Sequence, residues 1–321
     1  MNKSESYDAV VALRTSGERT FEASRAMIRE QVPGLPLYVI DEKPFKKAFE
    51  RCLEAGLEAG ARWLITADAD MLLLPDAINR MLQEAEKMPA GHLQLQGRIY
   101  DKITGTFRKG GPRIYRTEHL GKLLALSKES SDHIRPESSK IRILQKQGHP
   151  SRYLYRVFAL HDFEQYYKDL YRKALVHAVK HPELVTALIY RSTNLQERDD
   201  DFRVVLKAVW DGLTSHKEIS IDSRLFEEES NRTLAELGLQ EKSELELNGV
   251  TSEFVDLLSI QLPEEFEQEK EHPKRYDLPL VEEAASDKFR TIVRKKGIIR
   301  GISHSIGSML IKTGEKLRGR E

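Results

Sequence analysis

Short apolar runs alternate with amphipathic segments through the N-terminal part of this chain, and this alternation constrains the fold more than any other feature. The runs at residues 7–15, 35–41 and 62–67 are typical of buried strands, and the segments that follow them have the period of helices. Strand–helix–strand units of this length need right-handed crossovers between parallel strands. The sequence therefore predicts an α/β domain with a mainly parallel sheet and helices on its faces.

Polar residues end each of these strands. Arg14 and Thr15 end the first, Asp41 ends the second, and Asp68 and Asp70 follow the third. Because ligands bind beyond the carboxyl ends of parallel strands, we expect these residues to share one cleft.

Asp68 and Asp70, in the stretch RWLITADAD, carry the most specific chemical signal. Residues two apart in a strand point the same way, so two bare carboxylates would repel each other. A cation that prefers hard oxygen ligands, Mg²⁺ or Mn²⁺, explains such a pair. The alternative is structural, since aspartates after a strand also cap helices and start turns.

The pattern changes after residue 88. The expected elements are strands at 92–100 and 105–117 and helices at 118–128 and 139–147. The sequence Gly-Gly-Pro at residues 110–112 is expected to break the second strand, and Gly148 to end the second helix in the left-handed conformation. An apolar strand at residues 151–162 then brings His161 to its end.

A composition shift near residue 163 predicts a domain boundary, because the periodicity beyond it is almost entirely helical. We expect a domain over residues 1–165, a helical extension over 166–280 and a basic amphipathic tail over 281–321. Such a tail would bind an anionic membrane surface, or dock onto the acidic segment 217–270 of its own chain or of a partner. Both alternatives stay open, and the second would favour self-association.

Composition excludes several classes of protein. Lys+Arg 51 balance Asp+Glu 51, so no chain-wide basic character points to nucleic acid. The single cysteine, Cys52, excludes an intrachain disulfide and a cysteine-rich zinc site, and it fits a reducing compartment. Neither a secretory leader nor a run of about twenty apolar residues is evident, so we expect a cytoplasmic protein that is at most peripheral to a membrane.

The order of these features resembles a family 2-like glycosyltransferase of the GT-A fold, over residues 7 to 165. The features are strand ends at Arg14-Thr15 and Asp41, the Asp-x-Asp pair, a Gly-Gly-x-x-x-x-Arg turn ending at Arg116, an acid eleven residues before Gly148, and a strand end at His161. The resemblance implies a nucleotide-sugar-binding domain followed by a mainly helical extension. It also implies metal-dependent, inverting transfer of a sugar to a hydroxyl of a glycan or lipid-linked acceptor.

The resemblance assigns a role to each residue of the metal site. Asp70 matches the position that binds the metal directly, Asp68 the one that reaches ribose or a metal-bound water, and His161 a further metal or phosphate contact. Mn²⁺ or Mg²⁺ would stabilise the charge on the departing pyrophosphate. For His161, capping of the next helix together with Asp162 is the alternative.

Thr15 and Asp41 match positions that contact the nucleoside. The motifs Pro-x-x-Asn and Asp-Asp-Gly-Ser, usual at these positions, are replaced here by RTSG at 14–17 and DEKP at 41–44. The identity of the bound nucleotide is therefore not predicted, and the alternative for Asp41 is a turn residue. The guanidinium groups of Arg113 and Arg116 could bind pyrophosphate or an anionic acceptor, or be solvated charges on a strand.

Inverting transfer also needs a general base for the acceptor hydroxyl. The resemblance assigns this role to Glu137, with Asp132 as the second candidate. Related sequences show two adjacent acids at this position, whereas here Glu137 lies between a proline and a serine. The alternative is a first-turn carboxylate stabilised by the helix dipole.

Two other functions fit parts of the pattern. A haloacid-type phosphatase also places Asp-x-Asp after an apolar strand, but after its first strand and with a small or β-branched residue where this chain has Leu72. A catalytically inactive nucleotide-sugar-binding or scaffold module fits the lone acid at Glu137 and is disfavoured by the intact Asp-x-Asp pair.

Overall fold

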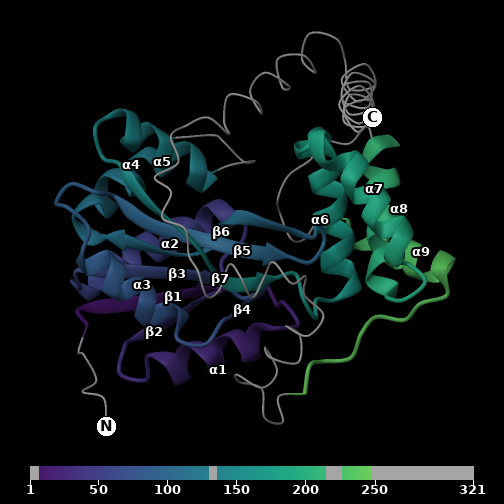
Figure 1. Ribbon diagram of the computed structural model, residues 1–321, viewed down its shortest axis with the longest axis horizontal. Helices are drawn as coiled ribbons and strands as arrows, with labels where there is room; N and C mark the ends of the chain where they lie inside the picture. The colour runs from purple at the N-terminus through teal and green to yellow at the C-terminus, as the bar shows by residue number, and fades with distance from the viewer. Residues whose placement is uncertain (1–6, 130–135, 215–225, 247–321) are drawn as a thin grey trace, which may run out of the picture. The chain divides into compact units, whose positions relative to one another are not determined.

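A computed structural model describes residues 7–129, 136–214 and 226–246 of the chain (Figure 1). These residues form two compact units. The first contains the described residues up to 169 together with 226–227 and 240–246, and the second contains 170–214 and 228–239. The division crosses two helices near their first residues, and each unit is described separately below.

The first unit is built on a seven-stranded sheet with the order β2-β1-β3-β6-β5-β7-β4. The strands are β1 (Ala9–Arg14), β2 (Leu37–Ile40), β3 (Trp63–Asp68), β4 (Met71–Leu73), β5 (Gln94–Asp101), β6 (Thr106–Arg116) and β7 (Ser151–His161). The pairings give β1, β2, β3, β5 and β7 one direction, and β6 and β4 the opposite one. The predicted α/β class with a mainly parallel sheet is thus confirmed.

Helices cover both faces of this sheet, with α1 below it and α4 and α5 above it in the view of Figure 1. One face packs against α1 (Phe21–Gln31) and α3 (Ala77–Glu86), and the other against α2 (Phe45–Ala59), α4 (Leu120–Lys128) and α5 (Pro136–Lys146). The interior strand β1 is entirely buried because alternate residues serve the two cores, with Val11 on one side and Val10 on the other. This burial explains its unbroken apolar sequence.

Strand direction brings polar residues from distant parts of the chain to one edge of the sheet. Arg14 and Asp68 pair at the ends of β1 and β3, and Asp101 and His161 pair at the ends of β5 and β7. The edge strand β4 starts beside the end of β7, where Met71 pairs with His161. The strands that carry these residues share one direction, so their carboxyl ends form a common site.

Two strand features differ from expectation. The run after Asp70 forms β4, which was not predicted because three residues are too few to show a period. The Gly-Gly-Pro sequence does not break β6; between the pairs Gln96–Arg113 and Arg98–Lys109 the register shifts instead. Gly111 there has a φ of +88°, which glycine adopts without strain in a bulge.

The second unit is helical, as predicted. Its elements are most of α6 (Tyr167–Lys180), then α7 (Val185–Leu195), α8 (Asp200–Thr214) and most of α9 (Glu227–Leu237), with a short 3₁₀ turn at Pro182–Leu184. A second 3₁₀ turn, at Thr117–His119, lies in the first unit. The basic tail 281–321 and most of the acidic segment 217–270 lie outside the described residues. Among the helices that the structure describes, none combines the length and apolar character needed to cross a membrane.

Gly97 allows β5 and β7 to approach closely, and its substitution tests this packing. A Cβ atom at this position would lie 2.2 Å from Cδ2 of the buried Phe158 ring and 3.0 Å from the carbonyl oxygen of Arg156. We expect Gly97→Ala to lower the free energy of unfolding by about 1–3 kcal/mol, because the ring must shift within a packed core. Urea unfolding followed by circular dichroism measures this change.

Gly34→Ala is the matched control, since a Cβ at exposed Gly34 meets nothing within 4 Å. It should change the free energy of unfolding by no more than about 0.5 kcal/mol. Equal stability of the two variants would show that the β5–β7 contact tolerates a larger residue.

Candidate active site

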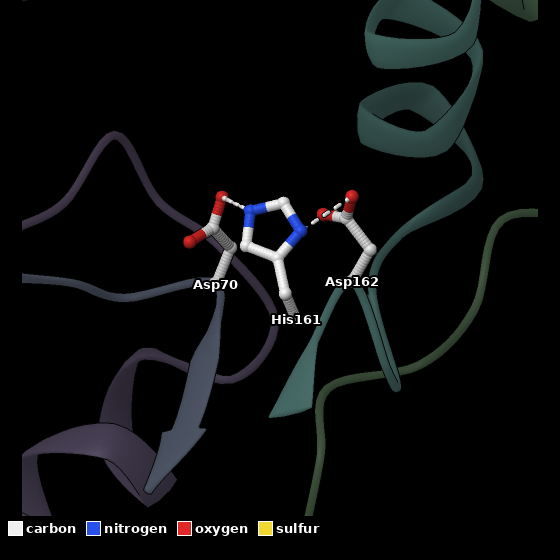
Figure 2. A group of neighbouring side chains, drawn as sticks. All are labelled: Asp70, His161 and Asp162. Carbon is white, nitrogen blue, oxygen red and sulfur yellow. Dashed lines mark ion pairs between the residues drawn. The ribbon is translucent and has the colours of Figure 1, made fainter. Parts of the chain in front are cut away.

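Three side chains at the carboxyl edge of the sheet form a potential metal site. Figure 2 shows the imidazole of His161 between the carboxylates of Asp70 and Asp162. Nε2 of His161 lies 3.4 Å from Oδ2 of Asp70, and Nδ1 lies 2.9 Å from Oδ2 of Asp162. One ligand atom from each residue falls within 4.8 Å of the others. Two carboxylates and an imidazole are a donor set that Mn²⁺ and similar divalent ions accept.

The backbone holds these three residues together. Asp70 lies in the turn between β3 and β4, and β4 pairs in antiparallel fashion with the end of β7, where His161 lies. The amide of Asp162 donates a hydrogen bond to the carbonyl of Asp70 at 3.2 Å. Asp162 has a φ of +64°, a conformation that aspartate tolerates better than most residues. The site is therefore built by strand pairing rather than by side chains alone.

The surroundings of His161 favour its positively charged form. Burial by itself lowers the pKa of the imidazole, but the charges of Asp162 and Asp70 outweigh burial and raise the pKa well above its ordinary value. A hydrogen bond to Asp101 acts in the same direction. The imidazolium thus occupies a position between carboxylates that suits a metal cation, and a metal bound through this ring would displace its proton.

Two neighbours of His161 were not identified from the sequence. Asp101 is fully buried, with Oδ2 3.1 Å from Nδ1 of His161 and 2.7 Å from a terminal nitrogen of Arg108. The sequence places Asp101 at the start of a turn, where an aspartate that helps to form a site looks the same as one that starts a turn. Only the β5–β7 pairing reveals its role.

Asp68 takes a partner of its own. Arg14 donates to its carboxylate from Nε at 2.5 Å and from a terminal nitrogen at 3.1 Å. Burial raises the pKa of Asp68; Arg14 opposes this rise, and the charge of Asp70 adds to it. The two aspartates are therefore close enough to interact, although Asp68 pairs with arginine and is not a member of the potential metal group.

Glu137, the predicted base, is buried in the first turn of α5 next to this pair. Its carboxylate accepts a hydrogen bond from the hydroxyl of Tyr115 at 2.5 Å and lies 3.7 Å from both Arg14 and Arg113. Burial alone raises the pKa of Glu137, but the two guanidinium groups and the hydroxyl outweigh it. The net effect is a lowered pKa, so Glu137 is ionised at neutral pH.

The other residues predicted for the site are Thr15, Asp41 and Asp132, and the two that the structure describes, Thr15 and Asp41, do not belong to the potential metal group. Thr15 follows β1 and donates to Glu18 at 2.8 Å, and Asp41 is exposed after β2, with Oδ1 3.7 Å from Nζ of Lys43. Asp132 lies outside the described residues.

Arg116, one of two arginines expected either to bind pyrophosphate or an anionic acceptor or to be a charge on the strand, lies at the other end of β3 from Asp68. It pairs with Trp63 at the start of β3, whereas Asp68 ends that strand. Its guanidinium lies 4.6 Å above the Trp63 ring and donates to backbone carbonyls, including that of Met88 at 3.2 Å. Because β6 runs antiparallel to β3, the arginines of this strand that reach the site are Arg108 and Arg113, which come earlier in the sequence.

Comparison with known proteins gives no family by sequence, since no family model and no curated protein matches the chain. Solved structures similar to about half of the chain include glycosyltransferases and cytidylyltransferases. A glycosyltransferase involved in glycosylation of the major capsid of PBCV-1 is 14% identical over 48% of this chain and 94% of its own, with a TM-score of 0.35.

Two further structures give similar values. The 4-diphosphocytidyl-2C-methyl-D-erythritol synthase of Anaerococcus prevotii is 8% identical over 45% of this chain and 88% of its own, with a TM-score of 0.35. A provisionally named nucleotide-diphospho-sugar transferase from Desulfovibrio desulfuricans is 8% identical over 64% of this chain and 99% of its own, with a TM-score of 0.32. At these low identities the similarity concerns the fold alone.

Proposed function

We propose that this protein is a metal-dependent glycosyltransferase that moves a sugar from a nucleotide-sugar donor to an acceptor hydroxyl. The observation that carries the proposal is the group Asp70, His161 and Asp162 at the carboxyl edge of the sheet, in which His161 and Asp162 are buried and Asp70 is partly buried. An ionised buried carboxylate, Glu137, lies in the adjoining ion-pair network of the same unit. The order of motifs along the sequence supports the same reaction.

Asp70, His161 and Asp162 would hold the cation, with Mn²⁺ or Mg²⁺ as the candidates. When bound, a divalent cation supplies Lewis-acid stabilisation of the negative charge that develops on a departing pyrophosphate. Asp68 is held by Arg14 beside this group, at a suitable place to meet the ribose. Thr15 and Asp41, at the ends of β1 and β2, are the proposed contacts to the nucleoside.

Glu137 is the proposed general base, which takes the proton from the hydroxyl of the sugar acceptor. Direct displacement by this hydroxyl would invert the configuration at the sugar. Arg14 and Arg113 keep its carboxylate ionised, but they also make it a weak base while they remain at 3.7 Å. A guanidinium that turns toward donor phosphate would release this restraint, because it binds phosphate in the same bidentate manner as carboxylate. Donor binding would thus prepare the base. Glycan and lipid-linked hydroxyls are the proposed acceptor classes.

Donor and cation should stabilise the protein together. We expect one class among UDP-, GDP-, CMP- and dTDP-linked sugars to raise the thermal midpoint in the presence of Mn²⁺. At a donor concentration of a hundred times its Kd, the free energy of unfolding should rise by about 2.7 kcal/mol. Asp70→Asn should abolish this rise, because it removes a ligand of the cation. Thermal unfolding with and without Mn²⁺ measures the effect.

Asp76→Asn is the control, since Asp76 is an exposed carboxylate paired with Arg80 and has a φ of +63° that asparagine tolerates. It should respond to donor and Mn²⁺ as the wild type does. A wild type that no donor stabilises, or an Asp70→Asn variant that responds fully, would contradict the proposed donor site.

Removing the Glu137 carboxylate should impair turnover more than donor binding. With the donor class identified, we expect Glu137→Gln to lower kcat by about 10²–10⁴-fold, because a positioned base contributes that much, while the Kd of the donor changes little. Tyr115→Phe is the matched variant, since it removes the hydrogen bond to Glu137 but keeps the carboxylate. Turnover of the radiolabelled donor measures both.

Two results would revise this assignment. A Glu137→Gln variant with the turnover of Tyr115→Phe would place the base elsewhere. A wild type that binds the donor with Mn²⁺ but shows neither transfer nor hydrolysis would identify an inactive nucleotide-sugar-binding module instead of an enzyme.

A further inference from the structure

Asp101 is joined to the metal group by a contact that the proposed reaction does not use. It lies at the end of β5 with no exposed surface and pairs with His161 across the β5–β7 ladder. Its Oδ2 accepts a hydrogen bond from Nε of Arg108 at 2.8 Å and lies 3.1 Å from Nδ1 of His161. Its Oδ1 accepts from the amide of Thr104 at 2.9 Å and from the Thr104 hydroxyl at 3.1 Å. Both oxygens are therefore fixed.

The surroundings of Nδ1 decide which ring nitrogen of His161 can bind a cation. Carboxylate oxygens of Asp162 and Asp101 lie 2.9 and 3.1 Å from Nδ1. A terminal nitrogen of Arg108 lies farther away, at 3.3 Å. Carboxylates accept hydrogen bonds and guanidinium groups only donate them, so the two shorter contacts make Nδ1 the protonated donor. Nε2, which faces Asp70, is left to bind the cation.

Asp162 cannot both bind a cation and remain the partner of Nδ1 of His161. Figure 2 shows Asp162 and Asp70 on opposite sides of the imidazole. A cation shared by Asp70, Nε2 and Asp162 would draw the Asp162 carboxylate away from Nδ1. Asp101 would remain as the acceptor at that nitrogen, because Arg108 donates to the oxygen of Asp101 that faces His161 and holds it in place.

We propose that Asp101, held by Arg108, is a positioning residue that keeps Nδ1 of His161 protonated and Nε2 directed at the cation. This inference rests on the proposed metal-dependent function. A carboxylate behind a ligating histidine fixes its tautomer and ring orientation and makes it a better ligand, and loss of such a partner costs about 10–100-fold in metal affinity.

The test uses Mn²⁺ as the probe and the full chain. Binding is followed by electron paramagnetic resonance of free Mn²⁺, and pulsed spectra report coupling of the bound ion to a ¹⁴N nucleus of imidazole. We expect Asp101→Leu, which has a similar shape but no acceptor, to weaken Mn²⁺ binding by about 10–100-fold and to lose the ¹⁴N coupling. A purely structural role would not change the coupling of ions that still bind.

Two further variants keep the test decisive. Asp101→Leu combined with Arg108→Met removes the ion pair as a whole, so no charge is left buried alone, and it should show the same loss as Asp101→Leu. Thr104→Val removes a hydrogen bond to the oxygen of Asp101 that does not face His161, and it should bind Mn²⁺ with wild-type affinity and coupling. Thermal unfolding without metal checks the fold of each variant.

The outcomes separate the inference from the proposed function. Wild-type affinity and ¹⁴N coupling in the Asp101 variants would overturn the inference alone. An equal loss in Thr104→Val would also overturn it, because the hairpin as a whole would then be responsible. Failure of the wild type to bind Mn²⁺ with an imidazole ligand would contradict the proposed cation site, and the inference with it.

Discussion

The gathering of five carboxylates at one edge of the sheet, three of them buried and two partly buried, is the constraint on which the site depends. Asp68, Asp101 and Glu137 pair with the guanidinium groups of Arg14, Arg108 and Arg113, whereas Asp70 and Asp162 pair with His161. Among these described side chains, a neutral His161 leaves two negative charges in excess, which is costly away from water. A proton on His161 neutralises one of them, and a divalent cation bound to the neutral ring neutralises both. Charge balance therefore favours a divalent ion, and it explains why the imidazole is protonated without one.

Electrostatic coupling joins the metal group to the rest of the site. The charge of Asp70 raises the pKa of Asp68, and Asp68 shares Arg14 with Glu137. A cation at Asp70 would offset that charge and strengthen the hold of Asp68 on Arg14. A stronger hold on Arg14 would weaken its grip on Glu137, so the proposed cation site and the proposed base can influence each other through two ion pairs. The chain of contacts has this continuity because β1 and β3 end side by side.

The sequence predicts some residues of this site and misses others, and the reason for the missed residues is physical. Asp70 and His161 were expected together because each ends or follows an apolar run, and strand ends meet at one edge. Asp162, Asp101 and Arg108 could not be assigned in the same way, since their roles depend on the β4–β7, β5–β7 and β5–β6 registers. The same reason explains the position of Arg116: a local motif counts residues along the chain, but the antiparallel pairing decides which arginines of β6, here Arg108 and Arg113, reach the site. The helices and longer strands were predictable because their periods are long enough to read, whereas the three residues of β4 were not.

The central claim is that Asp70 and His161 hold a divalent cation, and anomalous X-ray scattering from crystals soaked in Mn²⁺ tests it most directly. Data collected on either side of the manganese absorption edge locate the ion without regard to any assay. The account predicts a peak about 2.0–2.2 Å from a carboxylate oxygen of Asp70 and from Nε2 of His161, with the Nδ1 nitrogen still bonded to Asp101. A peak at other residues only, or no peak while His161 remains in contact with Asp70, would contradict it.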